Sequence, residues 1–325
     1  MMASRLALLR ALGLFLGSFA AATCLAQSEP YPSRPVRMSV PYPPGGATDI
    51  IARNLAMKLQ DFLGQPVVFE YKPGAGGVVA SEYVAKSTSD GYTTAMVTTA
   101  HVINPGLRPL PYDTLKDFAG VSMVAVSHIL IAANPSVEAN NLEELIAYAR
   151  RNPGRLSFAS SGVGGAMHMS GELLKYMTGI DIVHVPYKGG AAAYPDVIAG
   201  RIPLIIDPIF GVWPYVKSGK LKAVAIASPS RSSSYPDVPV VAETVPGYSV
   251  MSITGVVVPR AVPRGAVNRL SADIGRALQS ADIKARMQEA GMEPSPTTPD
   301  QFDSYIRTEI EKWAKVIRQA NITPE

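Results

Sequence analysis

The chain has 325 residues, and its 30 Lys and Arg against 26 Asp and Glu give a formal net charge of +4 at pH 7. This small excess, without a dense basic run, excludes the charge pattern of a nucleic-acid-binding protein. The single cysteine is Cys24, so the sequence after it excludes a disulfide framework, a thiol nucleophile and a cysteine-ligated metal.

The N-terminal segment has the pattern of a secretory signal peptide. Arg5 and Arg10 supply positive charge, residues 11–22 are apolar, and Cys24-Leu25-Ala26 resembles a small-x-Ala cleavage site. The uncharged part is shorter than the about 20 apolar residues that a membrane span needs. We predict that residues 1–26 are removed by cleavage near Ala26 and that the mature chain is periplasmic. Lipidation of the cysteine is the alternative, although the residue before it is a poor match to the usual Gly or Ala.

Strands and helices alternate along the rest of the chain. Apolar runs with β-branched residues indicate strands, and apolar residues repeating every three to four positions indicate helices. This alternation predicts an α/β fold with parallel sheets covered by helices on both faces. In chain order we predict strands at 36–40, 67–71, 92–99, 121–133, 156–159, 182–185, 204–206 and 223–227, and helices at 50–63, 78–86, 141–150, 167–177, 266–279, 283–290 and 299–320.

Three turns rich in glycine or hydroxyl side chains follow predicted strands and precede predicted helices. They span residues 43–49, 73–77 and 160–165. Glycine lets a backbone approach a ligand closely, and the first N–H groups of a helix are unpaired and carry partial positive charge. Because ligands of parallel α/β sheets bind beyond the carboxyl ends of the strands, these turns predict a site for a small anion such as a carboxylate. Ordinary strand-to-helix connections are the alternative for any one turn.

Polar side chains near the predicted strand ends have two interpretations each. His101 and His168 are either donors to a ligand or packed histidines bonded to the backbone. Asp207 follows a buried-looking strand, and it either receives a ligand ammonium or holds its loop through backbone N–H groups. Asp49 is predicted to serve the start of its helix as a cap or a first-turn acid.

The sequence gives no positive sign of a metal site or of catalysis. His128 and His184 lie within apolar runs and are predicted core residues, and the four histidines lack H-x-x-x-H spacing. No phosphate-binding loop, complete dinucleotide fingerprint or G-x-S-x-G elbow occurs. We therefore predict no cofactor, no metal and no enzymatic site.

Several longer motifs resemble one known family. The chain is similar, from about Tyr31 to Ile322, to the extracytoplasmic solute receptors of tripartite tricarboxylate transporters, the Bug family. The motifs that carry the resemblance are the runs 31–37, 40–49, 73–77, 90–93, 103–105, 183–189 and 236–239.

The resemblance implies the type II periplasmic-binding-protein fold, in which two α/β lobes enclose a ligand cleft. The apolar runs 121–133 and 250–258 are placed to cross between the lobes. We therefore expect a first lobe made of residues 27–127 and 251–325, and a second lobe made of residues 128–250.

The resemblance also implies a function and a site. A small carboxylated molecule would bind without catalysis, the partners would be membrane transporter subunits, and the chain would be a monomer without a cofactor. In the family, loops corresponding to 42–49 and 160–168 face the ligand from opposite lobes. The ligand-binding residues expected here are Tyr42, Gly45, Gly46, Thr48, Asp49, Gly76, Thr98, His101, Ser160, Ser161, Gly162, His168 and Asp207.

The chain departs from the family pattern at three places, so the ligand is not carried over. Tyr71 stands where the family commonly has Asn, Gly165 replaces a common Ser, and 252–255 replaces a commonly aromatic stretch. Two other functions stay open. One is a receptor that signals to a membrane partner, and the other is an exported hydrolase that uses Ser161 and His168.

Overall fold

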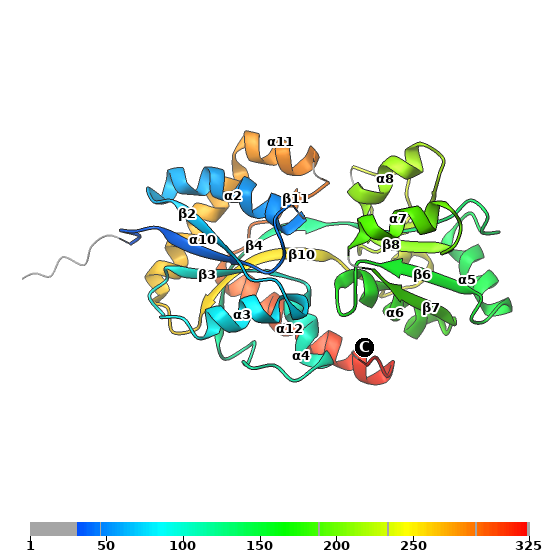
Figure 1. The fold of residues 1–325 in the computed structure, drawn as a ribbon, viewed down its shortest axis with the longest axis horizontal. Helices are drawn as coiled ribbons and strands as arrows, with labels where there is room; N and C mark the ends of the chain where they lie inside the picture. The colour runs from blue at the N-terminus through cyan, green and yellow to red at the C-terminus, as the bar shows by residue number, and fades with distance from the viewer. Residues whose placement is uncertain (1–30, 46, 188, 233, 290, 324–325) are drawn as a thin grey trace, which may run out of the picture.

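The computed structural model describes residues 31–45, 47–187, 189–232, 234–289 and 291–323 (Figure 1). The predicted signal peptide and Gly46 lie outside the described residues. Within the described ranges, no helix is long and apolar enough to cross a membrane. The chain forms two α/β lobes, each built around one sheet, which lie side by side along the long axis of the molecule.

The sheet of the first lobe has six strands in the order β11-β4-β10-β3-β1-β2. β1 pairs in parallel with β2 and β3, whereas β10 pairs antiparallel with both β3 and β4. The strands are β1 (Val36–Val40), β2 (Val67–Tyr71), β3 (Thr93–Thr98), β4 (Phe118–Ser127), β10 (Ser252–Pro259) and β11 (Glu293–Pro294).

Helices cover both faces of this first sheet (Figure 1). On one face, α2, α10 and α11 bury apolar side chains such as Leu55 and Ile274. On the other face, α3, α4 and α12 bury side chains such as Ile103 and Trp313. The helices are α2 (Ala47–Leu63), α3 (Val78–Ala85), α4 (Ala100–Leu107), α10 (Arg264–Gln279), α11 (Ala281–Glu289) and α12 (Pro299–Gln319), with a short 3₁₀ turn, η1 (Ala75–Gly77), before α3.

The second lobe repeats this layering around a five-stranded sheet in the order β7-β6-β8-β5-β9. α5 and α6 bury side chains such as Leu145 and Leu174 on one face, and α7 and α8 bury Val197 and Val212 on the other. The elements are β5 (Ile129–Ala133), β6 (Leu156–Ser160), β7 (Ile182–Pro186), β8 (Leu204–Pro208), β9 (Lys222–Ile226), α5 (Leu142–Arg151), α6 (Ala166–Thr178), α7 (Gly190–Ile198), α8 (Ile209–Lys217) and α9 (Val241–Thr244).

The prediction of parallel sheets is wrong for the strands that connect the lobes. The apolar run 121–133 is divided between β4 of the first sheet and β5 of the second, with His128 between them. β10 returns beside β4, with Ser252 opposite Ser127, so both crossings lie next to each other. A strand that comes from the other lobe enters the sheet at the edge where the carboxyl ends of the parallel strands lie. β5 and β10 therefore run antiparallel to their neighbours β8 and β3.

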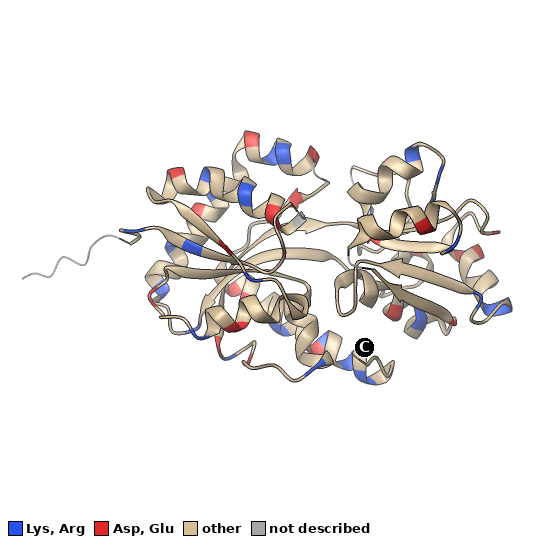
Figure 2. Ribbon diagram, in the orientation of Figure 1, with Lys and Arg blue, Asp and Glu red and all other residues tan. Residues whose placement is uncertain are grey.

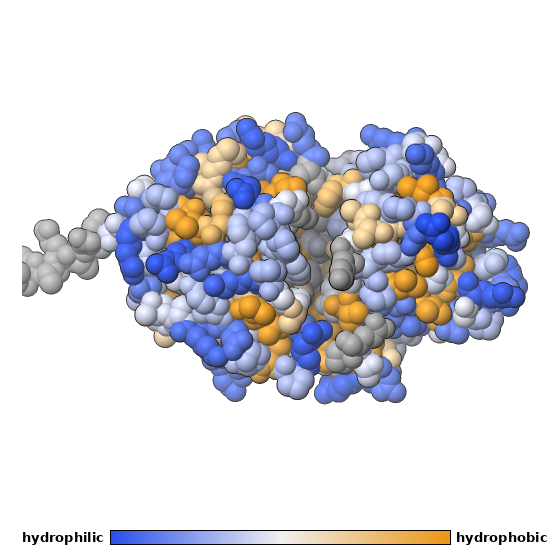
Figure 3. All heavy atoms as spheres, in the orientation of Figure 1, coloured by the Kyte–Doolittle hydropathy of each residue, from blue (hydrophilic) through white to orange (hydrophobic). Residues whose placement is uncertain are grey.

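This topology places the carboxyl ends of the parallel strands of both sheets at the gap between the lobes. β10 enters the first sheet from the second lobe, and β5 enters the second sheet from the first lobe. Figure 3 shows a hollow between the lobes at this place. In Figure 2 many of the Lys, Arg, Asp and Glu residues lie on the helices that cover the two sheets.

Three short helices at the gap were missing from the sequence-based prediction. They are α4, α7 and α8, and each contains a proline, at Pro105, Pro195 and Pro214. Proline lacks an N–H group and is usually read as the end of a helix. These helices form because each packs an apolar side against its sheet, and packing supplies most of the stability of short helices.

Candidate functional site

The first-lobe turn between β1 and α2 is held by the carboxylate of Asp49. This carboxylate accepts hydrogen bonds from the Gly45 N–H (2.8 Å), the Tyr71 hydroxyl (2.6 Å) and Nε of Arg53 (3.0 Å). Burial raises the pKa of Asp49, but these bonds outweigh burial and hold the pKa below its usual range. Asp49 thus fixes the turn from inside, and Tyr71, at a position where the chain departs from the family, is one of its partners.

The rest of this turn is open toward the gap. Gly45 is exposed and has φ +88°, a conformation that favours glycine. Tyr42 lies 3.5 Å from Thr98, hydroxyl to hydroxyl, which joins the turn to the end of β3. Thr48 is buried at the start of α2. Gly46 lies outside the described residues, so its place in the turn is not assigned.

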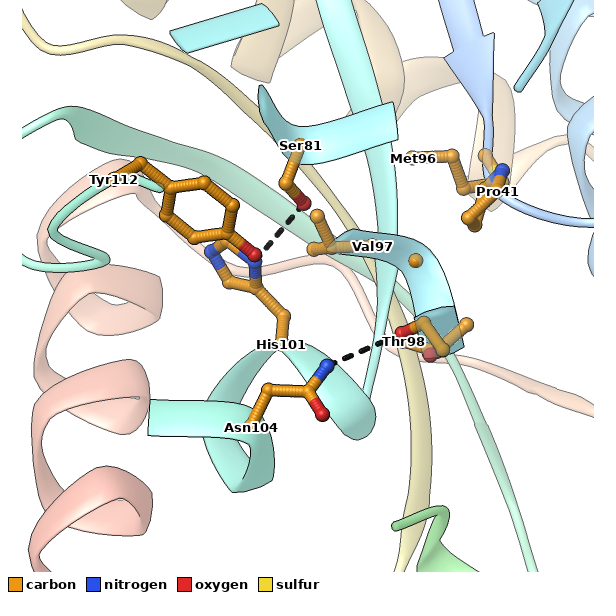
Figure 4. A pocket seen from close by; sticks show the side chains of 10 residues that line it. Pro41, Ser81, Met96, Val97, Thr98, His101, Asn104 and Tyr112 are labelled. Carbon is orange, nitrogen blue, oxygen red and sulfur yellow. Dashed lines mark hydrogen bonds between the residues drawn. The ribbon is translucent and has the colours of Figure 1, made fainter. Parts of the chain in front are cut away.

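The second glycine turn borders a small pocket at the ends of β1 and β3 (Figure 4). Its free space of about 10 Å³ is enough for about one water molecule. The carbonyl of Gly76 accepts a hydrogen bond from Nδ2 of Asn104 on α4 (3.3 Å). The pocket is lined by Pro41, Gly76, Gly77, Ser81, Met96, Val97, Thr98, His101, Asn104 and Tyr112.

His101 lies in the wall of this pocket and is packed by protein on all sides. Its Nδ1 lies 3.5 Å from the Ser81 hydroxyl, its ring meets Phe118 edge-on, and Nε2 has no partner among the described residues. Burial lowers the pKa of His101 to about 4, so the ring is neutral at pH 7. Of the two interpretations made from the sequence, this geometry favours a packed histidine.

The second-lobe loop after β6 is held by two histidines and a serine. The Ser160 hydroxyl lies 2.7 Å from Nε2 of His184 and is fully buried. The Gly164 N–H donates to Nδ1 of His168 (3.2 Å). The rings of His168 and His184 stack with their centroids 4.1 Å apart. One connected cluster therefore fixes both ends of the loop.

Both histidines of this cluster are neutral. Burial is the main cause, and it lowers the pKa of His168 to about 3 and that of His184 to about 4. A neutral ring is also what the geometry requires, because Nδ1 of His168 accepts a hydrogen bond from the Gly164 N–H and therefore carries no proton itself. His184 was predicted only as a core residue, and it proves to be a partner of Ser160.

Two expected site residues of this loop are more open. Ser161 and Gly162 are half-buried, and the carbonyl of Ser161 accepts from the Gly189 N–H (3.3 Å). Gly162 has φ +133°, which favours glycine, and its N–H donates to the Ser160 hydroxyl (3.2 Å). Among the described residues the Ser161 hydroxyl has no hydrogen-bond partner, so it is the group of this loop that remains available to a ligand.

Asp207 ends β8 and faces the start of α7. Its carboxylate accepts a hydrogen bond from Tyr194 (2.7 Å), and a methyl group built on Gly190 would lie only 1.8 Å from Oδ2. Burial raises the pKa of Asp207 to about 7, although the bond from Tyr194 opposes this. The close fit against the first residue of α7 favours the loop-holding interpretation.

Helix α4 brings the two lobes into contact. A methyl group built on Gly164 of the second lobe would lie 3.0 Å from Cδ1 of Leu107 and 3.8 Å from Oδ1 of Asn104. Asn104 therefore lies between the glycine turn of the first lobe and the loop of the second. Sequence reasoning missed Asn104 as a site residue, although it lies in the run 103–105 that carried the family resemblance.

Comparison with known proteins decides the family. The TctC family model, described as "Tripartite tricarboxylate transporter family receptor", matches residues 51–322. The chain belongs to this receptor family. It is 36% identical to protein BugT of Bordetella pertussis over 316 residues, which covers 96% of this chain and 97% of BugT. The resemblance read from the motifs is confirmed.

Solved structures with the same fold include two with bound acids. R. palustris Rpa4515 with adipate has a TM-score of 0.80 at 34% identity, covering 91% of this chain and 100% of that chain. MatC (Rpa3494) from Rhodopseudomonas palustris with bound malate has a TM-score of 0.77 at 31% identity, covering 88% and 100%. The predicted two-lobe periplasmic-binding-protein fold is confirmed, and the receptor is a solute-binding protein of a tripartite transporter.

Proposed function

We propose that this receptor captures a small carboxylated molecule between its lobes in the periplasm and delivers it to the membrane subunits of its transporter. The observation that carries the proposal is the arrangement of helix starts at the gap. The parallel strands of both sheets end there, and helices α3, α6 and α7 begin directly after glycines, Gly77, Gly165 and Gly189. Unpaired N–H groups and helix dipoles from both lobes thus converge where a carboxylate would bind.

The expected site residues divide into two groups by their surroundings. We assign ligand contact to the exposed and half-buried residues Tyr42, Gly45, Gly76, Thr98, Ser161 and Gly162, to Thr48 at the helix start, and to Gly46, which lies outside the described residues. The N–H groups of Gly45 and Gly162 bond to Asp49 and Ser160, so these two glycines would let the backbone come close to the ligand rather than donate to it. The remaining side chains bond within the protein, and we assign them to holding the loops: Asp49, His101, Ser160, His168 and Asp207.

We assign the first lobe to residues 27–127 and 251–325 and the second to residues 128–250. His128 and the residues before β10 are the two crossings, and they lie side by side because Ser127 pairs with Ser252. The hydroxyl of Thr99 fastens the start of α4 to this crossing, since it accepts from the Ile253 N–H (2.9 Å) and donates to the Met251 carbonyl (3.3 Å). Capture would therefore proceed by hinge closure about these strands.

We propose that binding occurs without catalysis, without a cofactor and by a monomer. The hydrolase alternative named Ser161 and His168, but the Nδ1 of His168 is occupied by the Gly164 N–H. The serine of this loop that meets a histidine is Ser160, and it is fully buried. A signalling receptor uses the same closed state, so it differs from a transport receptor in its partner rather than in its ligand site.

Thermal-shift screening of the mature protein against small carboxylic acids tests the proposal. A ligand that binds only the folded state raises Tm in proportion to the logarithm of its concentration. We expect di- or tricarboxylates to raise Tm, calorimetry to give a one-to-one complex, and small-angle scattering to show compaction. A panel that leaves Tm unchanged, or hydrolysis of an ester or amide that is lost in Ser161→Ala, would contradict it.

A further inference from the structure

Helix α4 carries a line of polar residues along one face at the gap. His101, Asn104 and Arg108 are spaced three and four residues apart, which places them on the same side of a helix and its C-terminal cap. Asn104 bonds to the carbonyl of Gly76 in the first lobe and lies beside Gly164 of the second. Arg108 follows one turn later and lies beside the same loop, since a methyl group built on Gly164 would be 3.5 Å from its Nη2.

The Arg108 guanidinium is partly buried and has no anionic partner among the described residues. It is half-buried, its Nε is buried without a hydrogen bond, and within the described ranges no carboxylate pairs with it. A partly buried charge is costly unless it is paired. The planar guanidinium matches a carboxylate with two parallel N–H bonds, so the missing partner has a defined chemistry.

We propose that Arg108 binds a second carboxylate of the ligand at the α4 edge of the gap, while the glycine turns bind the first. This inference rests on the proposed function and narrows its ligand to an acid with two separated anionic groups. Because Arg108 belongs to the first lobe and lies beside the second-lobe loop at Gly164, a ligand bound to it would also join the two lobes.

Calorimetry on the full mature receptor tests Arg108 with defined probes. Succinate, malate and adipate are titrated first, and the tightest binder is then compared with its own monoamide. The parent should prefer the diacid by about 10- to 150-fold, the range expected for one hydrogen bond to a charged group. Arg108→Gln should bind the diacid and the monoamide equally, and Arg108→Lys should recover part of the preference because it keeps the charge without the planar fork.

Arg155→Gln is the matched control. Arg155 is exposed at the opposite end of β6 from the loop, and its substitution removes the same charge. It should leave the preference unchanged, and Arg108→Gln should keep the Tm of the ligand-free parent. The inference is overturned if Arg108→Gln retains the preference for the diacid, or if it weakens diacid and monoamide by the same factor. Both of those outcomes leave the receptor function standing, whereas a parent that binds none of the acids overturns the function and this inference together.

Discussion

The two ligand-facing loops are held in place by opposite kinds of chemistry. In the first lobe, the charged Asp49 binds Gly45, Arg53 and Tyr71, and Arg53 is more than half exposed to solvent. In the second lobe, the loop from Ser160 to Gly164 is held by two buried, neutral histidines. One loop depends on a carboxylate staying charged, and the other depends on imidazoles staying uncharged.

The two loops therefore differ in the pH at which they are sensitive. The pKa of Asp49 is lowered, so its bonds persist at any pH well above 4. The pKa values of His168 and His184 are lowered from 6.5, so the folded loop opposes protonation of these rings as soon as the pH falls below 6.5. Acid should therefore act on the second-lobe loop before it acts on the first-lobe turn.

The largest expected effect is a loss of stability on acidification. The unfolded chain binds protons at histidine below pH 6.5, whereas the folded chain does so only near pH 3 to 4. The stabilising contribution is thus complete above pH 6.5 and is lost as the pH falls toward 4. One fully buried histidine with a folded pKa of about 4 would account for about 2 kcal/mol between pH 7.5 and 5, and His184 should contribute less because solvent reaches part of its ring.

Urea denaturation of the parent and of a His168→Phe/His184→Phe double variant measures this effect. The variant keeps a stacked aromatic pair but has nothing to titrate, so its free energy of unfolding should fall less between pH 7.5 and 5, even though it starts lower. His101 stays in both proteins and contributes equally to each. Equal pH dependence in the two proteins would show that the pair is not kept neutral by the fold.

Glycine-to-alanine substitutions should give the next largest loss of stability, and they compare the backbone conformations of the two loops. Gly164 has φ +78° and a methyl group there would press on Leu107 at 3.0 Å. Gly45 has φ +88° but open space around it. A left-handed conformation costs a non-glycine residue about 1–2 kcal/mol. We expect Gly164→Ala to lower stability by about 2 kcal/mol and Gly45→Ala by about 1 kcal/mol.

Gly165→Ala is the control in the same loop. Gly165 has φ −89° and nothing within 4 Å of an added methyl group, but it is the N-cap of α6, where alanine is less favourable than glycine. These two effects oppose each other, so stability should change by less than about 1 kcal/mol. Thermal unfolding ranks the three variants. Because Gly164 lies at the contact between the lobes, its substitution should also weaken ligand binding more than that of Gly45. A reversed ranking would mean that the loop and α4 do not meet in solution.

The sequence predicted the strands and long helices well because their apolar patterns are regular. The turn at 43–49 and the loop at 160–165 were correctly placed between a strand and a helix. The short helices α4, α7 and α8 were missed because each contains a proline, which usually marks the end of a helix, and because their apolar periodicity is weak. They are stabilised by packing on a sheet, which the sequence alone does not show. The divided run 121–133 was placed at a crossing through the family resemblance, since nothing in its composition marks where one sheet ends.

For the candidate site, sequence reasoning predicted the positions of the residues but not the directions of their side chains. Ser160 and His168 were proposed for the ligand because they neighbour a glycine-rich loop, and the structure turns both side chains toward His184. His184 is 16 residues beyond His168, on another strand, so only the sheet register brings them together. Arg108 was not singled out because its role depends on Gly164 of the other lobe.

Substitution of two neighbouring serines distinguishes a residue that stabilises the loop from one that contacts the ligand. Ser160→Ala removes a buried hydroxyl from His184, which should lower stability by about 1–2 kcal/mol. Ser161→Ala removes a half-buried hydroxyl that has no hydrogen-bond partner among the described residues, so stability should change by less than about 0.5 kcal/mol. Calorimetry should show about tenfold weaker acid binding by Ser161→Ala if its hydroxyl meets the ligand. Unchanged affinity would remove Ser161 from the site.

The smallest expected effect on pH dependence is that of Asp49→Asn in the first-lobe turn. Asparagine keeps an oxygen to accept from the Gly45 N–H, but it loses the charge that faces Arg53, and its amide group replaces the oxygen that accepts from the Tyr71 hydroxyl. A hydrogen bond to a charged group contributes about 1.5–3 kcal/mol, so stability should fall by about 1–3 kcal/mol. The pH dependence between 7.5 and 5 should match that of the parent, because the stabilising bonds of a carboxylate with a lowered pKa fail only as the pH falls below about 4. Urea titrations at both pH values check this, and a variant whose pH profile flattens like that of the histidine double variant would refute the assignment of acid sensitivity to the second lobe.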